Sequence, residues 1–175
     1  MAKENPLASN LTLEQQKNLF GNAYLNMLWH CPTDQRFPYW VHLPDCYYDE
    51  KDPHYKLLVI IHGTGCAVED YVRHAKELAD RDHVAVLAPL FPGGLIQRDD
   101  FNSYKLLSCD GVRYDQILLD MIDDMAKRYP GVETDKFFLF GHSGGGQFVN
   151  RFLFAHPEKL RACAIGAPGR PTFLN

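Results

Sequence analysis

Two hydrophobic patterns alternate along the chain. In one, apolar residues recur every three or four positions, and in the other they alternate with polar residues or form unbroken runs. Over residues 11–29, apolar side chains recur three and four positions apart, and Thr12 with Gln15 forms a capping-box pattern. This predicts an N-terminal helix behind a loose polar leader over residues 1–10. The predicted helix either packs on the domain or serves as a cap or dimerisation element.

The pattern then changes to a period of two. Apolar and polar residues alternate over 37–43 and Pro44 ends the run, which predicts an edge-type strand. After a turn over 45–56, residues 57–61 are continuously apolar, and so are residues 84–88. Unbroken apolar runs of this length are typical of strands that are covered on both faces.

Helical periodicity returns between and after these runs. Residues 67–80 have a helical pattern, and their place between two buried runs predicts parallel strands joined by a right-handed crossover. A second helical pattern begins at Asp110 or Gly111 and extends to Tyr129, where Pro130 and the next glycine end it.

Three further elements complete the expected order: a strand over 136–140, a helix over 144–156 and a strand over 160–165. The chain has no internal repeat or low-complexity tract. We therefore expect one α/β domain over residues 36–175, with a mostly parallel sheet and helices on both faces, after a leader and helix over 1–35.

The connection over residues 89–110 is long for a compact domain, and loops of that length are usually functional or mobile. Two aromatic residues in it, Phe91 and Phe101, either line an apolar pocket or pack the loop.

The composition argues against several classes of function. The 175 residues are 46% hydrophobic, which is enough for one packed core, and the net charge of −4 leaves no broad cationic surface for nucleic acid. No apolar run approaches the roughly 20 residues that span a bilayer. The N-terminus also lacks the apolar segment of a secretory signal. We expect a soluble, cytoplasmic protein without membrane or nucleic-acid partners.

The five cysteines are widely spaced and form no C-x-x-C pair, which argues against a disulfide framework and against a zinc site. Most are expected to be small buried hydrophobic residues. Cys66 follows a glycine-rich loop, and we expect it to pack or line a site rather than act as a second nucleophile.

The motif that carries chemistry is G-x-S-x-G at residues 141–145. It follows the apolar run 137–140 and leads into the helical stretch 147–153, which is the setting of a nucleophile elbow. Such a turn strains the backbone at the serine and aims the helix amides at its hydroxyl. Ser143 is the predicted nucleophile. Because no phosphate-binding glycine pattern is present, this interpretation is favoured over a phosphate loop or a purely structural turn.

A second loop, His62-Gly63-Thr64-Gly65, comes directly after the buried run 57–61. Acyl transfer needs hydrogen-bond donors where the carbonyl oxygen becomes an oxyanion. We expect the backbone N–H groups of Thr64 and Gly144 to be these donors.

Two histidines and two glycines are expected to shape this site. His62 either hydrogen-bonds within the loop, which its position in the loop's own turn favours, or acts as the catalytic base. His142 is a packing residue or a substrate contact, and Gly63 and Gly65 shape the loop.

These motifs resemble the α/β-hydrolase superfamily, and within it the esterases related to polyhydroxybutyrate depolymerases. The resemblance extends from Lys56 to Pro168 and rests on "LLVIIHGTG", "VAVLAPLFP" and the run from "FFLFGHSGGG" to "GAPG". It implies an α/β-hydrolase fold and hydrolysis of a small acyl substrate without a metal or organic cofactor. It also implies Ser143 as nucleophile, with Thr64 and Gly144 as oxyanion donors.

The chain departs from the order of that family after the elbow, where an acid and then a histidine should follow the serine. Here one helix and one strand follow Ser143, and His156 and Glu158 are expected at the far end of the sheet. A serine hydroxyl without a base is a poor nucleophile, so the chain alone should be nearly inert.

The C-terminal strands of the fold are expected to be missing from this chain, which leaves a hydrophobic sheet edge open. A missing segment or a second polypeptide is expected to complete the sheet and the triad. The other arrangement is a homo-oligomer that shares strands or catalytic groups. The predicted activity is that of a serine esterase or lactonase. The alternatives are an inactive hydrolase-like binding module, or a lyase, transferase or isomerase on the same fold.

Overall fold

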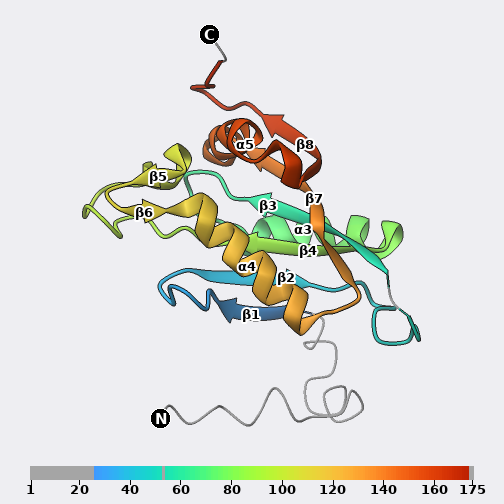
Figure 1. Ribbon diagram of the computed structural model, residues 1–175. Helices are drawn as coiled ribbons and strands as arrows, with labels where there is room; N and C mark the ends of the chain where they lie inside the picture. Colours follow the sequence, from blue (N-terminus) through green and yellow to red (C-terminus); the bar gives the residue numbers. More distant parts are fainter. Residues whose placement is uncertain (1–25, 53, 174–175) are drawn as a thin grey trace, which may run out of the picture.

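A computed structural model describes residues 26–52 and 54–173 and shows a six-stranded sheet (Figure 1). The strands are, in sheet order, β1 (Asn26–His30), β2 (Pro38–His42), β4 (Val84–Pro89), β3 (Tyr55–Ile61), β7 (Val132–His142) and β8 (Leu160–Gly166). Pairing is antiparallel between β1 and β2 and between β2 and β4, and parallel through β4, β3, β7 and β8. The predicted mostly parallel sheet is confirmed.

Helices cover both faces of this sheet. In Figure 1, α4 (Tyr114–Arg128) crosses in front of the sheet and α3 (Val68–Asp82) lies behind it. α4 and α5 (Gly144–Ala155) belong to one core cluster, whereas α3 packs into a smaller cluster with the other face of β3 and β4. The buried residues of α4 recur at three- and four-residue spacing, so the apolar stripe in the sequence is the face that packs: Ile117, Leu118, Met121, Ile122 and Met125.

The first described element corrects the sequence prediction. Residues 26–30 are strand β1, so the helix predicted over 11–29 is wrong at its end, and the rest of that prediction lies outside the described residues. The side chains of β1 alternate between partly buried and exposed positions, and Leu28 is 51% exposed. The sheet therefore begins before residue 36. β2, predicted as an edge strand, lies between β1 and β4.

Contacts with α4 explain why this segment is extended. The Trp29 indole N–H donates to the Tyr129 hydroxyl at 3.0 Å, and the Arg128 guanidinium lies 3.8 Å from the centre of a Trp29 ring. Arg128 also donates to Asp124 at 2.7 Å, and the Tyr39 hydroxyl donates to the same carboxylate at 2.5 Å. A short apolar run fits either period, so these distant partners select the strand.

The long connection before α4 contains more structure than predicted. Residues 103–106 form the 3-10 helix η2 (Ser103–Leu106), and a two-stranded hairpin of β5 (Ser108–Cys109) and β6 (Val112–Arg113) follows. Asp110 and Gly111 form its turn with φ of 46° and 81°, as type I′ turns require. α4 therefore begins at Tyr114, and the predicted start at Asp110 or Gly111 is wrong.

The far side of β8 has no partner strand among the described residues. Exposed positions such as Ala162 and Ala164 lie along this strand. The open edge expected from the sequence is therefore present in the described part of the chain. No helix in that part is long and apolar enough to cross a membrane, and its five cysteines are all free.

A buried carboxylate joins α4 to α5. Asp115, 2% exposed, accepts hydrogen bonds from the Arg113 guanidinium at 2.7 Å and from the His156 Nε2 at 2.9 Å. Burial by itself raises the pKa of Asp115, but the hydrogen bonds from Arg113 and His156 outweigh it and lower the pKa to about 2. His156 is thus engaged at the C-terminal end of α5, about 18 Å along the helix from Ser143.

We expect Asp115→Asn to lower the free energy of unfolding by about 2 kcal/mol near neutral pH, because the ionised carboxylate is preferentially stabilised in the folded state. Because the pKa of Asp115 in the folded state lies below the ordinary 3.8, its stabilisation of the fold is present above about pH 4. This stabilisation is lost as the pH falls through about 2.

Urea denaturation of wild type and variant across this pH range measures the difference. Asp123→Asn, on an exposed position of the same helix, is the matched control and should change stability little at any pH. A difference between wild type and Asp115→Asn that stays constant from neutral pH to about pH 2 would contradict this assignment.

Candidate active site

Ser143 lies at the junction of β7 and α5 with φ 57° and ψ −116°. A positive φ is unfavourable for a residue with a side chain, so the surrounding structure must hold this turn. The Ser143 N–H donates to the Gly166 carbonyl at 2.9 Å, and the Ser143 carbonyl accepts from the Gln147 N–H at 3.2 Å. β8 and α5 thereby fix a strained turn whose serine is exposed.

Two glycines make this turn sterically feasible. A Cβ atom on Gly145 would lie 2.1 Å from the Ile61 carbonyl oxygen. One on Gly144 would lie 2.4 Å from the Tyr104 hydroxyl and 3.0 Å from the Thr64 Oγ1. At Gly145 the obstacle is backbone, so only glycine lets the start of α5 approach the end of β3, whereas at Gly144 the crowding comes from the side chains that pack over the turn.

The loop after β3 lies against the turn because β3 and β7 are parallel neighbours whose carboxyl ends meet. A Cβ on Gly63 would lie 3.8 Å from the Ser143 Cβ. Ser143, Gly144, Gly63 and Thr64 are thus brought together as the motifs predict. Gly65 has open space around its Cβ position, with nothing within 4 Å, and the packing does not require glycine there.

The His62 ring is buried and both of its nitrogens are engaged. Its Nε2 accepts from the Phe91 N–H at 3.0 Å, so Nδ1 carries the proton and donates to the Gly63 carbonyl at 2.7 Å. Burial lowers the pKa of His62, which favours this neutral form. The ring therefore links the loops that follow β3 and β4, and neither nitrogen is available to Ser143.

His142 is exposed at the end of β7. Its Cδ2 atom lies 3.0 Å from the Cβ position of Gly166, so the ring lies over the end of β8. Its role as a packing residue or a substrate contact stays a prediction.

Two residues that the sequence did not single out, Tyr104 and Lys105 of η2, lie over the loop after β3. The Tyr104 hydroxyl donates to the His62 carbonyl at 3.1 Å, and the Lys105 Nζ donates to the Thr64 Oγ1 at 2.7 Å. Both side chains are buried, with exposed fractions of 3% and 6%. No motif marks either residue, because their contacts join segments about 40 positions apart.

Lys105 is a buried cation held by neutral groups. Besides Thr64, its Nζ donates to the Asn102 Oδ1 at 2.7 Å, and burial lowers the pKa of Lys105. Within residues 26–52 and 54–173, it forms no ion pair with a carboxylate. Because Lys105 occupies a lone pair of the Thr64 hydroxyl, the hydroxyl proton is directed toward another acceptor.

The two aromatic residues of the long loop have different surroundings. Phe91 is 1% exposed and stacks on Tyr104 and Phe148 with ring centres 5.6 and 5.4 Å apart, so it packs the loop. Phe101 is 47% exposed and lies against Gly93.

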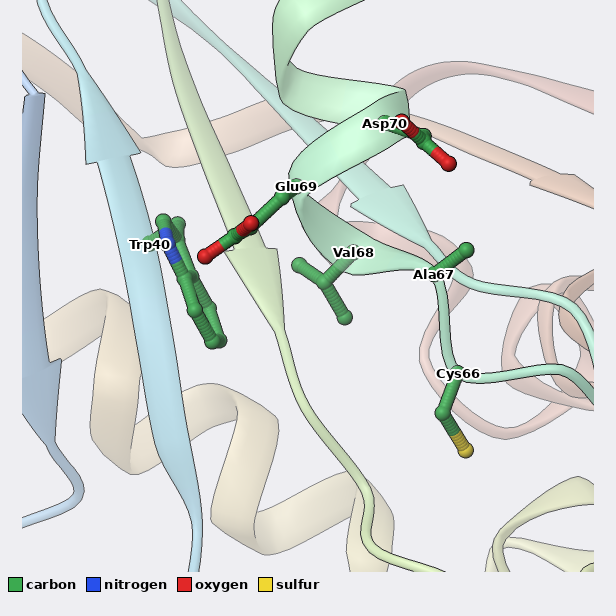
Figure 2. A pocket seen from close by; sticks show the side chains of 6 residues that line it. All are labelled: Trp40, Cys66, Ala67, Val68, Glu69 and Asp70. Atoms are coloured by element: carbon green, nitrogen blue, oxygen red, sulfur yellow. The ribbon is translucent and has the colours of Figure 1, made fainter.

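A hollow of about 250 Å³ lies beside the loop that joins β3 to α3, between β2 and the start of α3 (Figure 2). Across it, the Glu69 carboxylate points toward the Trp40 ring, while the Cys66 thiol points away from both. The thiol lies 3.6 Å from the Thr64 carbonyl oxygen, and burial raises the pKa of Cys66. A protonated thiol with this partner fits the expected lining role of Cys66.

Neither a protein-family model nor a curated protein sequence matches the chain. Solved structures do match it. FphF, a fluorophosphonate-binding serine hydrolase of Staphylococcus aureus, has a TM-score of 0.64 and 22% identity, over 80% of this chain and 55% of its own. Poly(aspartic acid) hydrolase-1 of Sphingomonas sp. KT-1 has a TM-score of 0.65 and 19% identity, over 86% of this chain and 58% of its own.

LpqC, a poly(3-hydroxybutyrate) depolymerase of Bordetella parapertussis, has a TM-score of 0.65 and 19% identity, over 89% of this chain and 56% of its own. The chain thus spans between 55 and 58% of the length of these three proteins. The shared architecture, with parallel strands β4, β3, β7 and β8 and helices on both faces, confirms the predicted fold. This chain has the α/β-hydrolase fold, and the solved structures that it resembles include a serine hydrolase and a ferulic acid esterase.

Proposed function

We propose that the protein containing this chain is a serine hydrolase that cleaves carboxylic esters of small acyl substrates, with Ser143 as the nucleophile. The observation that carries the proposal is the strained, exposed turn at Ser143, packed against the loop that contains Thr64. A serine held in a positive-φ turn at the start of a helix is the arrangement that nucleophile elbows use. The hydrolase and esterase structures with this fold support the reaction class.

In the proposed reaction, the Ser143 Oγ attacks the acyl carbon while its proton passes to a histidine base. The carbonyl oxygen becomes an oxyanion and accepts hydrogen bonds from the backbone N–H groups of Thr64 and Gly144. The ester C–O bond then breaks, and the alcohol leaves with the proton from the histidine. Water hydrolyses the resulting acyl-enzyme by the same sequence of steps. The reaction as proposed uses neither a metal nor an organic cofactor.

Lys105 is proposed to position the oxyanion loop. Its ammonium holds the Thr64 side chain through the hydrogen bond of 2.7 Å and also places a poorly solvated positive charge near the developing oxyanion. Electrostatic interactions strengthen where water is excluded, so this charge should favour the transition state over the neutral ester.

The histidine base and the acid are proposed to come from outside this chain. His62 and His156 are engaged in other hydrogen bonds, with the Gly63 carbonyl and Phe91 amide and with Asp115. The open side of β8 is where further strands would pair. A C-terminal segment or a second polypeptide there, or another copy of the chain, would complete both the sheet and the triad. The greater length of the matched structures supports this arrangement.

Reaction with a fluorophosphonate probe tests the nucleophile in the complete protein, including any companion polypeptide. We expect one probe per active site, attached to Ser143, and a loss of ester hydrolysis of at least about a thousandfold in Ser143→Ala. Ser108→Ala, which removes an exposed hydroxyl on β5, should react like wild type. Absence of labelling with every companion present would favour the inactive binding module instead.

Lys105→Met tests the positioning role, since methionine keeps much of the buried stem but removes the ammonium. For a neutral ester we expect kcat to fall by roughly tenfold to a hundredfold with little change in KM, because the lost interaction acts mainly in the transition state. Lys127→Met, at an exposed position of α4, is the control and should leave both constants unchanged. An increase in KM at unchanged kcat would show that Lys105 acts in ground-state binding instead.

A further inference from the structure

A second cluster of reactive side chains lies at the opposite end of the sheet from Ser143. Cys46 and Glu50 belong to the connection between β2 and β3, and His83 lies between α3 and β4. The amino ends of the parallel strands β3 and β4 bring these connections together. The cluster is separated from the Ser143 turn by the length of β3, about 20 Å, so it is distinct from the proposed active site.

One atom from each side chain lies within 4.8 Å of the others: the Cys46 sulfur, a Glu50 carboxylate oxygen and a His83 ring nitrogen. The Cys46 Sγ and the His83 Nδ1 are 3.2 Å apart. Bond lengths of about 2.3 Å to sulfur and about 2.0 Å to nitrogen place these atoms roughly 3.5 Å apart in a tetrahedral zinc site. The observed spacing therefore needs only a small outward movement to admit a metal ion.

His83 lies at the C-terminal end of α3, beside this cluster. His83 caps the C-terminus of α3 in a left-handed conformation, with φ 52° and ψ 56°, and its N–H donates to the Ala79 carbonyl. The ring also lies 6.3 Å from that of Tyr55, centre to centre. His83 is exposed, and its imidazole lies beside Cys46 at the junction of α3 and β4.

Tyr55 supplies an outer hydrogen-bond partner. Its ring is 1% exposed, and its hydroxyl lies 3.2 Å from the Cys46 sulfur. A thiolate can only accept a hydrogen bond, so the phenol O–H at this distance acts as the donor. A donor of this kind stabilises a metal-bound thiolate and fixes its orientation.

We propose that Cys46, Glu50 and His83 form a Zn²⁺ site, with Tyr55 as the hydrogen-bond donor to the thiolate. Thiolate, imidazole and carboxylate together suit zinc rather than Mg²⁺ or Ca²⁺, which bind oxygen ligands. Cys46 releases its thiol proton to solvent on binding, and water completes the four-coordinate shell. The bound ion links the β2–β3 connection to the α3–β4 connection and stabilises the amino ends of both strands.

Co²⁺ absorption and Zn²⁺ calorimetry on the full-length protein, freed of metal by a chelator, test the site. We expect one equivalent of Co²⁺ to give a thiolate-to-metal charge-transfer band with the strong d–d absorption of tetrahedral cobalt, and Zn²⁺ to displace it. Cys46→Ser should abolish the band. His83→Gln should weaken Zn²⁺ binding by more than about tenfold, and Tyr55→Phe by roughly tenfold.

Two further variants make each outcome decisive. Cys109→Ser alters another partly buried cysteine, in the β5–β6 hairpin, and should bind Co²⁺ like wild type. Glu50→Gln changes an exposed side chain and keeps the fold, so Zn²⁺ should raise the melting temperature of wild type but much less that of this variant. The assignment is overturned if the folded protein takes up no metal. It is also overturned if Cys46→Ser leaves the spectrum unchanged, or if Glu50→Gln responds to Zn²⁺ as wild type does.

Discussion

The approach of the first turn of α5 to the end of β3 is the constraint on which the rest of the candidate active site depends. At Gly145, the backbone comes so near the Ile61 carbonyl that a Cβ would lie 2.1 Å from it. The helix can therefore start directly beside the loop that contains Thr64, and Ser143 must turn with a positive φ to connect β7 to it. The backbone strain at Ser143 and the close approach of the loop that contains Thr64 have the same steric cause.

The proposed active site and the proposed Zn²⁺ site lie at opposite ends of the parallel part of the sheet. At the carboxyl ends of β3 and β7, the buried Lys105 lies beside the proposed oxyanion donors, at the edge where ligands of open α/β sheets usually bind. At the amino ends of β3 and β4, a thiol, an imidazole and a carboxylate create a region suited to a cation. The two regions lie at opposite ends of β3.

Much of the fold is encoded by local periodicity. Unbroken apolar runs predict β3 and β4, the apolar stripes predict α3 and α4, and the stretch after the serine motif predicts α5. The glycine-flanked Ser143 was identified because its turn stereochemistry depends on adjacent residues. The predicted elements are wrong where the local pattern fits a helix as well as another structure. The pattern over residues 26–29 predicts a helix, but these residues pair with β2, and the predicted helix start at Asp110 or Gly111 is the turn of a hairpin.

The α/β order, the strained serine turn and the glycine loop before it could be predicted, because neighbours within a few positions specify each of them. Contacts in the folded chain, by contrast, place Lys105 against Thr64, engage both His62 nitrogens and pack Trp29 against Arg128 of α4. It also brought Cys46 to His83, although cysteine spacing had argued against zinc. These pairs are separated by up to 100 residues, and sheet order, which sets their contacts, is not a local property.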